Sequence, residues 1–415
     1  MKKVLFVATA LAAFSSAFAV ATIEGKIVRQ QWPWNGKVNI DYILRDASGG
    51  VHDIGVVLKH GDTVIEANWG SLEGDLYGVG PGEHRIVWSP SVGIETPTAD
   101  VWDDFRVEIS ILDADDAFMI VDTPEGAPDR LSVTFTNAPP SGGWNTVEYK
   151  TSKMVLRRIP AGTFMMGSPT DELGRNGNLE TQHKVTLTKP FYIGIFPMTQ
   201  KQYKNITGRT DYAPSNSGDY KPAHTLAYQY LRGTNSWTTA WPNCEPTSFL
   251  GQLSAKVSLP ASLAGYSFDL PTDAQWEYAC RAGTTGAWNN GTTITNTTTD
   301  ANLNLLGRYK GSSGYMVVDV GLRLPNAYGL YDMHGNCADM VRDKAYGQGG
   351  RKWFDGSPMT DPLLAGDSWP YVFGRAGYWN DNASACRSAA RFTVGTISSA
   401  GNGYSPRLVL SFHED

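Results

Sequence analysis

Short runs in which apolar and polar residues alternate fill residues 20–137, and no stretch there has the spacing of an amphipathic helix. The clearest runs are VNIDYIL at 38–44 and FRVEISI at 105–111, and clusters of Gly, Pro and Ser separate the runs. In a half-buried strand every second side chain faces the core, which produces this alternation of apolar and polar residues. We therefore predict that residues 20–137 form an antiparallel β-sandwich. Nothing in it has catalytic spacing, so we interpret it as a spacer or binding module.

A cluster of Pro and Gly, APPSGG at 138–143, interrupts this pattern and predicts a domain boundary. We expect a linker at 138–152 and a second domain at 153–415. Trp, Tyr, Gly and Asn become frequent in this second region, and helix starts appear. Thr199 and Thr272 are each followed three residues later by Gln, which is the capping-box signature of a helix N-terminus.

The overall composition is that of a soluble globular chain. It has 415 residues, of which 35 are basic and 41 acidic, and a formal net charge of −6. This mildly acidic balance argues against a nucleic-acid partner. The 44 Gly and 13 Trp favour an irregular fold, because glycine permits turns with positive φ and buried aromatic rings fix the loops between them. Residues 284–299, rich in Thr, Asn and Gly, are expected to form an exposed loop.

The first 19 residues have the three parts of a secretory signal peptide. They are a basic start, MKK, an apolar run from Val4 to Phe14, and an A-x-A site that ends at Ala19. The apolar run is too short to span a bilayer, and no later segment is long enough to do so. We therefore expect cleavage after Ala19, export to the periplasm, the cell surface or the medium, and no membrane span.

Six ordered motifs in the second region match those of a known family. In chain order they are IPAGTFMMG at 159–167, FYIG at 191–194, LPT at 270–272, QWEYA at 275–279, PNAYGLYDMHGN at 325–336 and CRSAAR at 386–391. The region from about 153 to 410 thus resembles the formylglycine-generating enzyme, or sulfatase-modifying factor, family. The resemblance implies a compact α+β fold that is irregular and C-type-lectin-like. Most motif residues are interpreted as makers of this fold.

Active members of this family bind copper(I) through two cysteines in a C-x4-C pattern near the C-terminus. The corresponding loop here, RAGYWNDNASAC, holds one cysteine, Cys386. Counting forward from Arg375 places Asp381 and Cys386 at the two cysteine positions, whereas counting back from Arg391 places Ala383 at the second. The pair is absent on either count, so this loop alone cannot form a two-thiolate copper site.

Other departures concern the same part of the family pattern. The chain reads GNCADM at 335–340, where active relatives have two tryptophans, and SPR at 405–407 in place of Gly-Phe-Arg. The family also has a branch of iron enzymes that use several histidines. The second region contains four histidines without an H-x3-H pair. Because separated histidines can converge in space, the sequence does not exclude an iron site. The four histidines are His183, His224, His334 and His413.

The resemblance further implies a calcium site in the motif that ends at Asn336. By position, the ligands would be the side chain of Asp332, the carbonyls of Gly335 and Cys337, and the side chain of Asp339, which replaces a glutamate. Hard oxygen ligands with two carboxylates suit calcium. The alternative is that both aspartates only cap turns.

The resemblance also implies a disulfide between Cys280 and Cys386, because family members often bridge these two segments. Cys280 follows Trp276 on a predicted helix whose buried face should meet the C-terminal strand. An exported protein meets oxidising conditions in which such a bond persists. Cys244 and Cys337 are then left as a second pair.

Two functions of different kinds follow from these observations. In the first, the chain is a non-catalytic exported protein that presents loops, including the Gly- and Ser-rich segment 392–404, to a protein or glycan ligand. In the alternative, it is a formylglycine-generating oxidase, or a related metal-dependent oxidase, that acts on sulfatase cysteines with Cys386 as its catalytic residue. The missing cysteine pair favours the first hypothesis.

Overall fold

The computed structural model describes most of residues 21–412. Residues within these bounds that it does not describe are 32–35, 48, 62, 66–71, 77, 90–104, 112–116, 127, 211–215, 234–243, 346–355, 365–370, 397, 399–400 and 402. The predicted signal peptide and His413 lie outside the described residues.

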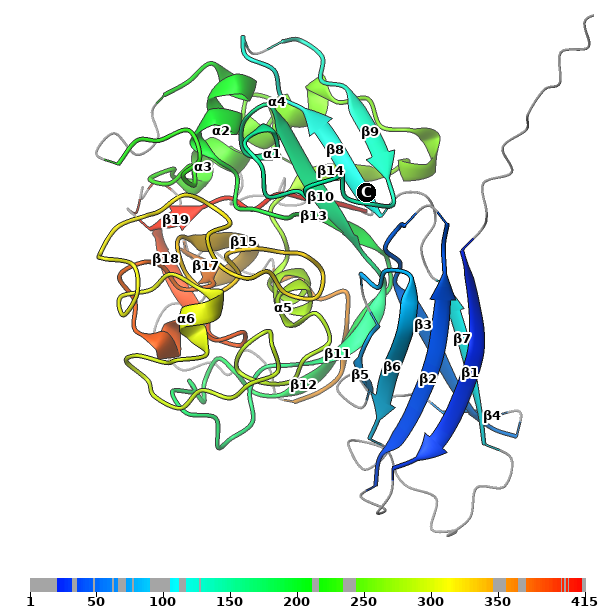
Figure 1. Ribbon diagram of the computed structural model, residues 1–415. Helices are drawn as coiled ribbons and strands as arrows, with labels where there is room; N and C mark the ends of the chain where they lie inside the picture. The colour runs from blue at the N-terminus through cyan, green and yellow to red at the C-terminus, as the bar shows by residue number, and fades with distance from the viewer. Residues whose placement is uncertain are drawn as a thin grey trace, which may run out of the picture.

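The N-terminal region is a β-sandwich, as the sequence predicts (Figure 1). Its first sheet has the strand order β1-β2-β6-β5, and its second has the order β4-β3-β7. The strands are β1 (Thr22–Gln30), β2 (Val38–Arg45), β3 (Ile54–His60), β4 (Thr63–Ile65), β5 (Leu72–Gly74), β6 (Gly82–Trp88) and β7 (Phe105–Ile111). Along β2 every second residue is buried, which is the alternation that identified this strand in the sequence.

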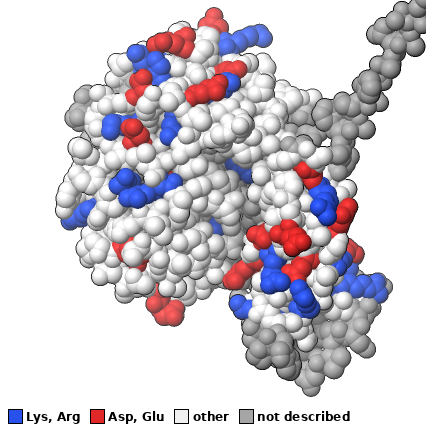
Figure 2. Space-filling model, in the orientation of Figure 1, with Lys and Arg blue, Asp and Glu red and all other residues white. Residues whose placement is uncertain are grey.

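Charges of opposite sign are interleaved on the outer face of this sandwich (Figure 2). Asp41 on β2 lies between Arg29 on β1 and Arg85 on β6, and its carboxylate contacts both guanidinium groups at 2.5 Å. The Arg85 hydrogen bond contributes most to lowering the pKa of Asp41, against the effect of burial. The sandwich therefore exposes paired rather than single-sign charge at this face.

The second domain begins earlier than the sequence predicted. Strands β8 (Phe118–Asp122) and β9 (Val133–Thr136) belong to a six-stranded sheet of order β14-β20-β13-β10-β8-β9 and not to the sandwich. The other strands are β10 (Lys153–Ile159), β13 (Phe191–Gly194), β14 (Tyr266–Asp269) and β20 (Val409–Phe412). The predicted boundary at 137/138 is therefore wrong: β8 has a strand pattern, but its hydrogen-bonding partner is β10.

The remainder of the second domain is α+β with short elements, which confirms the predicted fold class. Its helices are α1 (Glu148–Thr151), α2 (Gln200–Thr207), α3 (Tyr228–Arg232), α4 (Phe249–Lys256), α5 (Asp273–Arg281) and α6 (Leu303–Leu306). Its other strands are β11 (Gly162–Met166), β12 (His183–Leu187), β15 (Ala338–Ala345), β16 (Met359–Thr360), β17 (Tyr371–Arg375), β18 (Phe392–Thr396) and β19 (Tyr404–Ser405). None of the described helices is both long and apolar enough to span a bilayer.

Both predicted capping boxes are present. Thr199 begins α2 and Thr272 begins α5, and each hydroxyl accepts a hydrogen bond from the backbone N–H of the Gln three residues on. The segment 284–299 differs from its prediction, because it is only partly exposed. Trp288 is fully buried beside Cys386 in a small apolar cluster, so this loop covers the C-terminal motif.

Candidate functional site

The turn before β15 places two buried carboxylates in the second domain. It needs residues with positive φ, and Asp332, Gly335 and Asn336 have φ values of 55°, 109° and 65°. A Cβ at Gly335 would lie 2.2 Å from the carbonyl oxygen of Arg308, so only glycine fits there. Asn336 donates its backbone N–H to the same carbonyl at 2.6 Å. The motif glycine is therefore explained by close approach of the backbone.

Asp332 and Asp339 each use one carboxylate oxygen and leave the other without a hydrogen bond. Oδ2 of Asp332 accepts from the backbone N–H of Gly321 at 2.7 Å. Oδ2 of Asp339 accepts from Trp276 Nε1 at 2.8 Å and from Arg407 Nε at 2.7 Å. Both Oδ1 atoms are buried and have no partner, which is costly for a carboxylate.

Burial raises the pKa of both carboxylates. That of Asp332 rises to about 6, chiefly because of desolvation, with a further contribution from the charge of Asp339. The pKa of Asp339 also rises, because desolvation outweighs the lowering effect of Arg407. Two buried acids, each with an unused oxygen, offer the hard donors that suit a cation such as calcium. In the described part of the chain no three or more His, Cys, Asp or Glu side chains form a metal-binding group, so such a cation would also need main-chain carbonyls.

The guanidinium of Arg407 already pairs with the carboxylate of Asp339, which limits how a cation could be held there. The same guanidinium also donates to the carbonyls of Gly194, at 2.9 Å, and Tyr331, at 2.8 Å, and thus ties the turn to β13. This arginine retains the last position of the family's Gly-Phe-Arg motif. Trp276, whose place in the sequence indicates only one face of a helix, is the second donor to Asp339. Its indole nitrogen gave no sequence signal of this role.

The implied disulfide between Cys280 and Cys386 does not form in the structure, where all four cysteines are free thiols. The imidazole of His334 contacts both segments instead. Its Nδ1 lies 2.7 Å from the carbonyl oxygen of Cys386, and its Nε2 lies 3.9 Å from Cys280 Sγ. The Cys280 thiol also contacts Ser388 Oγ at 3.8 Å. A side chain that bonds both segments replaces the expected covalent bridge.

These contacts fix the protonation of His334. Nδ1 donates to the carbonyl of Cys386, so Nε2 accepts from the backbone N–H of Asn289 at 3.1 Å. Burial lowers the pKa of His334 to about 4, and the imidazole is therefore neutral near pH 7. With both nitrogens engaged, His334 has no free lone pair for a metal in this arrangement. His183 and His224 lie in other surroundings, with their Nδ1 atoms on Thr181 and Thr225.

Cys386 is poorly placed for thiolate chemistry. It is fully buried at the end of a short 3-10 turn, Ala383–Cys386, and its Sγ lies 3.8 Å from the carbonyl of Asn382. Burial, assisted by the charge of Asp381, raises its pKa well above the ordinary value. A copper(I) ligand or a nucleophile must be a thiolate, and this environment disfavours one.

The arginines of the C-terminal motif have structural partners. Arg391 and Arg375 contact Asp273 on α5, and Arg375 Nη2 reaches Glu277 Oε2 at 3.0 Å. Burial opposes ionisation of Glu277, yet its arginine neighbours together lower its pKa to about 2. Arg387 contacts Glu180 with two hydrogen bonds, of 2.8 and 2.9 Å. The Arg375 and Arg391 pairs thus fix this C-terminal segment against α5, and the Arg387 pair fixes it against the segment before β12.

Comparison with known proteins finds a family match over most of the second domain. The pattern of the family described as "Sulfatase-modifying factor enzyme 1-like domain" matches residues 144–402. The chain belongs to this family. Strands β8 and β9 of the six-stranded sheet precede the matched region.

Individual relatives of this sulfatase-modifying factor-like chain are distant. It is 26% identical over 209 residues to the Mus musculus protein named "Inactive C-alpha-formylglycine-generating enzyme 2", and the alignment covers 43% of this chain and 65% of the mouse protein, which is less than two thirds. Among solved structures it is similar to PvdO from Pseudomonas aeruginosa, with 25% identity, a TM-score of 0.49, and coverage of 62% of this chain and 94% of that chain. It is also similar to Treponema denticola variable protein 1, with 22% identity, a TM-score of 0.47 and coverage of 62% and 95%.

Proposed function

We propose that the chain is an exported protein whose sulfatase-modifying factor-like domain binds a ligand without the family's copper-dependent oxidation. The ligand is a protein or a glycan. It binds the loops around the turn at 332–339 together with the segment 392–404. The β-sandwich serves as a second module that carries this domain.

One observation carries this proposal: the loop that should hold two copper ligands holds one thiol, Cys386, which is buried and has a raised pKa. The alternative ligand in that loop, Asp381, is a hard oxygen donor whose own pKa burial raises to about 6. Copper(I) prefers thiolates over carboxylates. The name of the mouse relative, which describes an inactive protein, supports the same reading.

Calcium is part of this proposal. Asp332, Asp339 and the carbonyls of Gly335 and Cys337 would hold the ion, which would neutralise the buried carboxylate of Asp332 and stiffen the turn, while Asp339 also pairs with Arg407. The unused Oδ1 atoms of the two aspartates support it. Through Asn336, whose side-chain amide bonds the backbone of Val318 at 3.1 Å in both directions, a stiffer turn would also order the neighbouring loop.

The oxidase alternative has one observation in its favour. The Cys280 thiol lies against the opposite side of the His334 ring from the Cys386 carbonyl, so a second thiol exists near the loop although not within it. Under this alternative Cys386 would be catalytic and a sulfatase would be the substrate. The pKa of Cys280, which burial raises to about 12, argues against a thiolate there as well.

The decisive assay offers a peptide with the Cys-x-Pro-x-Arg sulfatase motif to the purified protein with copper and oxygen. Conversion of the thiol to an aldehyde is read by mass spectrometry. We expect none. Turnover that disappears in both Cys386→Ala and Cys280→Ala would overturn the proposal and establish the oxidase.

A further inference from the structure

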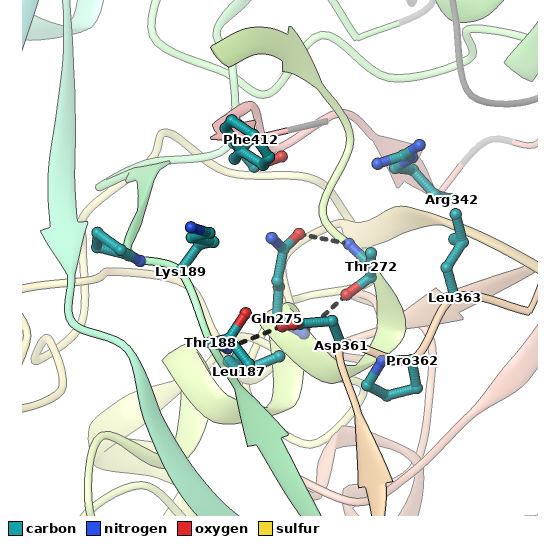
Figure 3. A pocket seen from close by; sticks show the side chains of 12 residues that line it. Leu187, Thr188, Lys189, Thr272, Gln275, Arg342, Asp361, Pro362, Leu363 and Phe412 are labelled. Carbon is teal, nitrogen blue, oxygen red and sulfur yellow. Dashed lines mark hydrogen bonds between the residues drawn. The ribbon is translucent and has the colours of Figure 1, made fainter. Parts of the chain in front are cut away.

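A cavity of about 290 Å³ opens on the second domain (Figure 3). The β12–β13 connection, the start of α5 and the end of β20 form its walls. This volume lies just below the roughly 300–1,000 Å³ of sites for drug-sized ligands, so it suits a smaller molecule. Nothing in the proposed function uses these residues.

The amide of Gln275 is held in one orientation at the floor of this cavity. Its Oε1 accepts the backbone N–H of Thr272 at 2.9 Å, while the Thr272 hydroxyl accepts the backbone N–H of Gln275 at 3.1 Å. Because the capping box engages the oxygen, the Nε2 donor must point away from Thr272. Figure 3 shows the amide nitrogen turned toward the side of the cavity that holds Lys189.

Lys189 places a positive charge beside this donor. Its ammonium lies 5.2 Å from the centre of the Phe412 ring, and among the described residues it forms no ion pair with a carboxylate. The acidic residue of the cavity, Asp361, directs one oxygen to the backbone N–H of Thr188 at 2.9 Å and the other to the Thr188 hydroxyl. Both oxygens of Asp361 thus bond Thr188, and in the described part of the chain this carboxylate forms no direct ion pair with Lys189.

Much of the remaining lining is apolar and comes from Leu187, Pro190, Pro362 and Leu363. Thr188, Ser411 and Arg342, whose guanidinium pairs with Asp269, complete it. We propose that this cavity binds a small organic carboxylate, whose oxygens accept from Lys189 Nζ and Gln275 Nε2 and whose flat apolar body lies against Phe412. A phosphate fits less well, because it offers no apolar surface to these walls.

The test uses the full mature chain and benzoate as the probe, titrated by ligand-observed NMR. Gln275→Glu keeps the capping box, since Glu is the other residue of that motif, but replaces the amide donor with a repelling carboxylate. Lys189→Ala removes the charge. We expect each variant to weaken benzoate binding by about tenfold or more, the effect of losing one charge-assisted hydrogen bond. Lys310→Ala, an exposed lysine on another surface, is the matched control and should bind like the parent.

Neutral benzamide and inorganic phosphate complete the test. We expect both to bind more weakly than benzoate. Equal binding of benzamide would overturn the role of the charge, and preferential binding of phosphate would overturn that of the apolar body. Benzoate binding that is absent from the parent, or unchanged in the two variants, would overturn the site itself. Thermal unfolding of each variant shows whether Gln275→Glu and Lys189→Ala retain the fold.

Discussion

The carboxylate of Asp53 and the guanidinium of Arg157 form a fully buried ion pair, 2.5 Å apart, between the β-sandwich and the central sheet of the second domain. Asp53 directly precedes β3, and Arg157 lies on β10. The same Asp53 oxygen accepts the backbone N–H of Gly78 at 2.9 Å, and the guanidinium stacks 4.9 Å from the Phe118 ring centre. The two domains thus share a desolvated contact and are not merely tethered by a linker (Figure 1).

Removing either partner of this pair should destabilise the protein strongly. Arg157→Ala leaves the Asp53 carboxylate buried without its counter-charge, and Asp53→Asn does the same to the guanidinium while keeping its shape. We expect each to lower the free energy of unfolding by about 3–5 kcal/mol, measured by urea denaturation. The control is Lys59→Ala, which breaks the exposed pair with Glu108 and should cost about 1 kcal/mol or less. Equal losses at the two pairs would contradict a desolvated contact.

The position of β8 leads to a prediction about where the second domain can be cut. A chain that starts at Ala117 keeps β8 and β9, whereas one that starts at Lys153 leaves the edge of β10 unpaired and removes the fully buried Met119 and Val121 from the core. We expect the longer chain to unfold cooperatively and the shorter one to be insoluble or to lack fixed tertiary structure. Near-ultraviolet circular dichroism and thermal melts distinguish them. If the shorter chain were as stable as the longer one, the domain boundary would lie at 138–152, as the sequence predicts.

These two findings show what local sequence patterns could and could not reveal. Alternation along β2 identified a strand because burial on one face is a local property. No local pattern at β8 could identify its partner, since β10 lies more than 30 residues away and strand pairing is a long-range choice. The capping boxes at Thr199 and Thr272 were predictable because every atom involved lies within four residues.

The candidate site divides in the same way. The family motif located Asp332 and Asp339, but only the fold shows that each keeps an unused oxygen. The place of His334 against both cysteine segments was unpredictable, because Cys280 and Cys386 approach it from segments more than 50 residues distant on either side. The family resemblance therefore implied a disulfide where the structure has hydrogen bonds and free thiols.

The thiols should behave as free but protected groups. Burial raises the pKa of Cys280 and Cys244 to about 12 and those of Cys337 and Cys386 well above the ordinary value. We expect little alkylation of the native protein by iodoacetamide at pH 8, and alkylation of all four after denaturation without a reductant. A peptide map under non-reducing conditions that joined Cys280 to Cys386 would contradict the structure.

The final prediction concerns stability against pH without calcium. The folded-state pKa of Asp332 is about 6, above its ordinary value of 3.8, so between these values the folded state binds a proton that the unfolded state has lost. The contribution of Asp332 to the free energy of unfolding is therefore greatest below about pH 4. It falls as the pH rises to about 6, at up to about 1.4 kcal/mol per pH unit. Asp332→Asn should remove this dependence, as measured by urea denaturation from pH 4 to 7. Burial also raises the pKa of Asp381 to about 6, but this residue lies outside the turn. Asp381→Asn should therefore remove only the separate contribution of Asp381 to the pH dependence.

Calcium should reverse this loss, because it binds the ionised carboxylates. At pH 7.5, calcium at about 100 times its dissociation constant should stabilise the parent by about 2.7 kcal/mol, seen as a higher melting temperature. The gain should shrink at pH 5, where Asp332 holds a proton, and be largely lost in Asp332→Asn, whose amide can still accept from Gly321 and tolerates the positive φ. Asp381→Asn should respond like the parent. A melting temperature that calcium leaves unchanged at pH 7.5, or raises equally in Asp332→Asn, would show that the two aspartates only hold the turn.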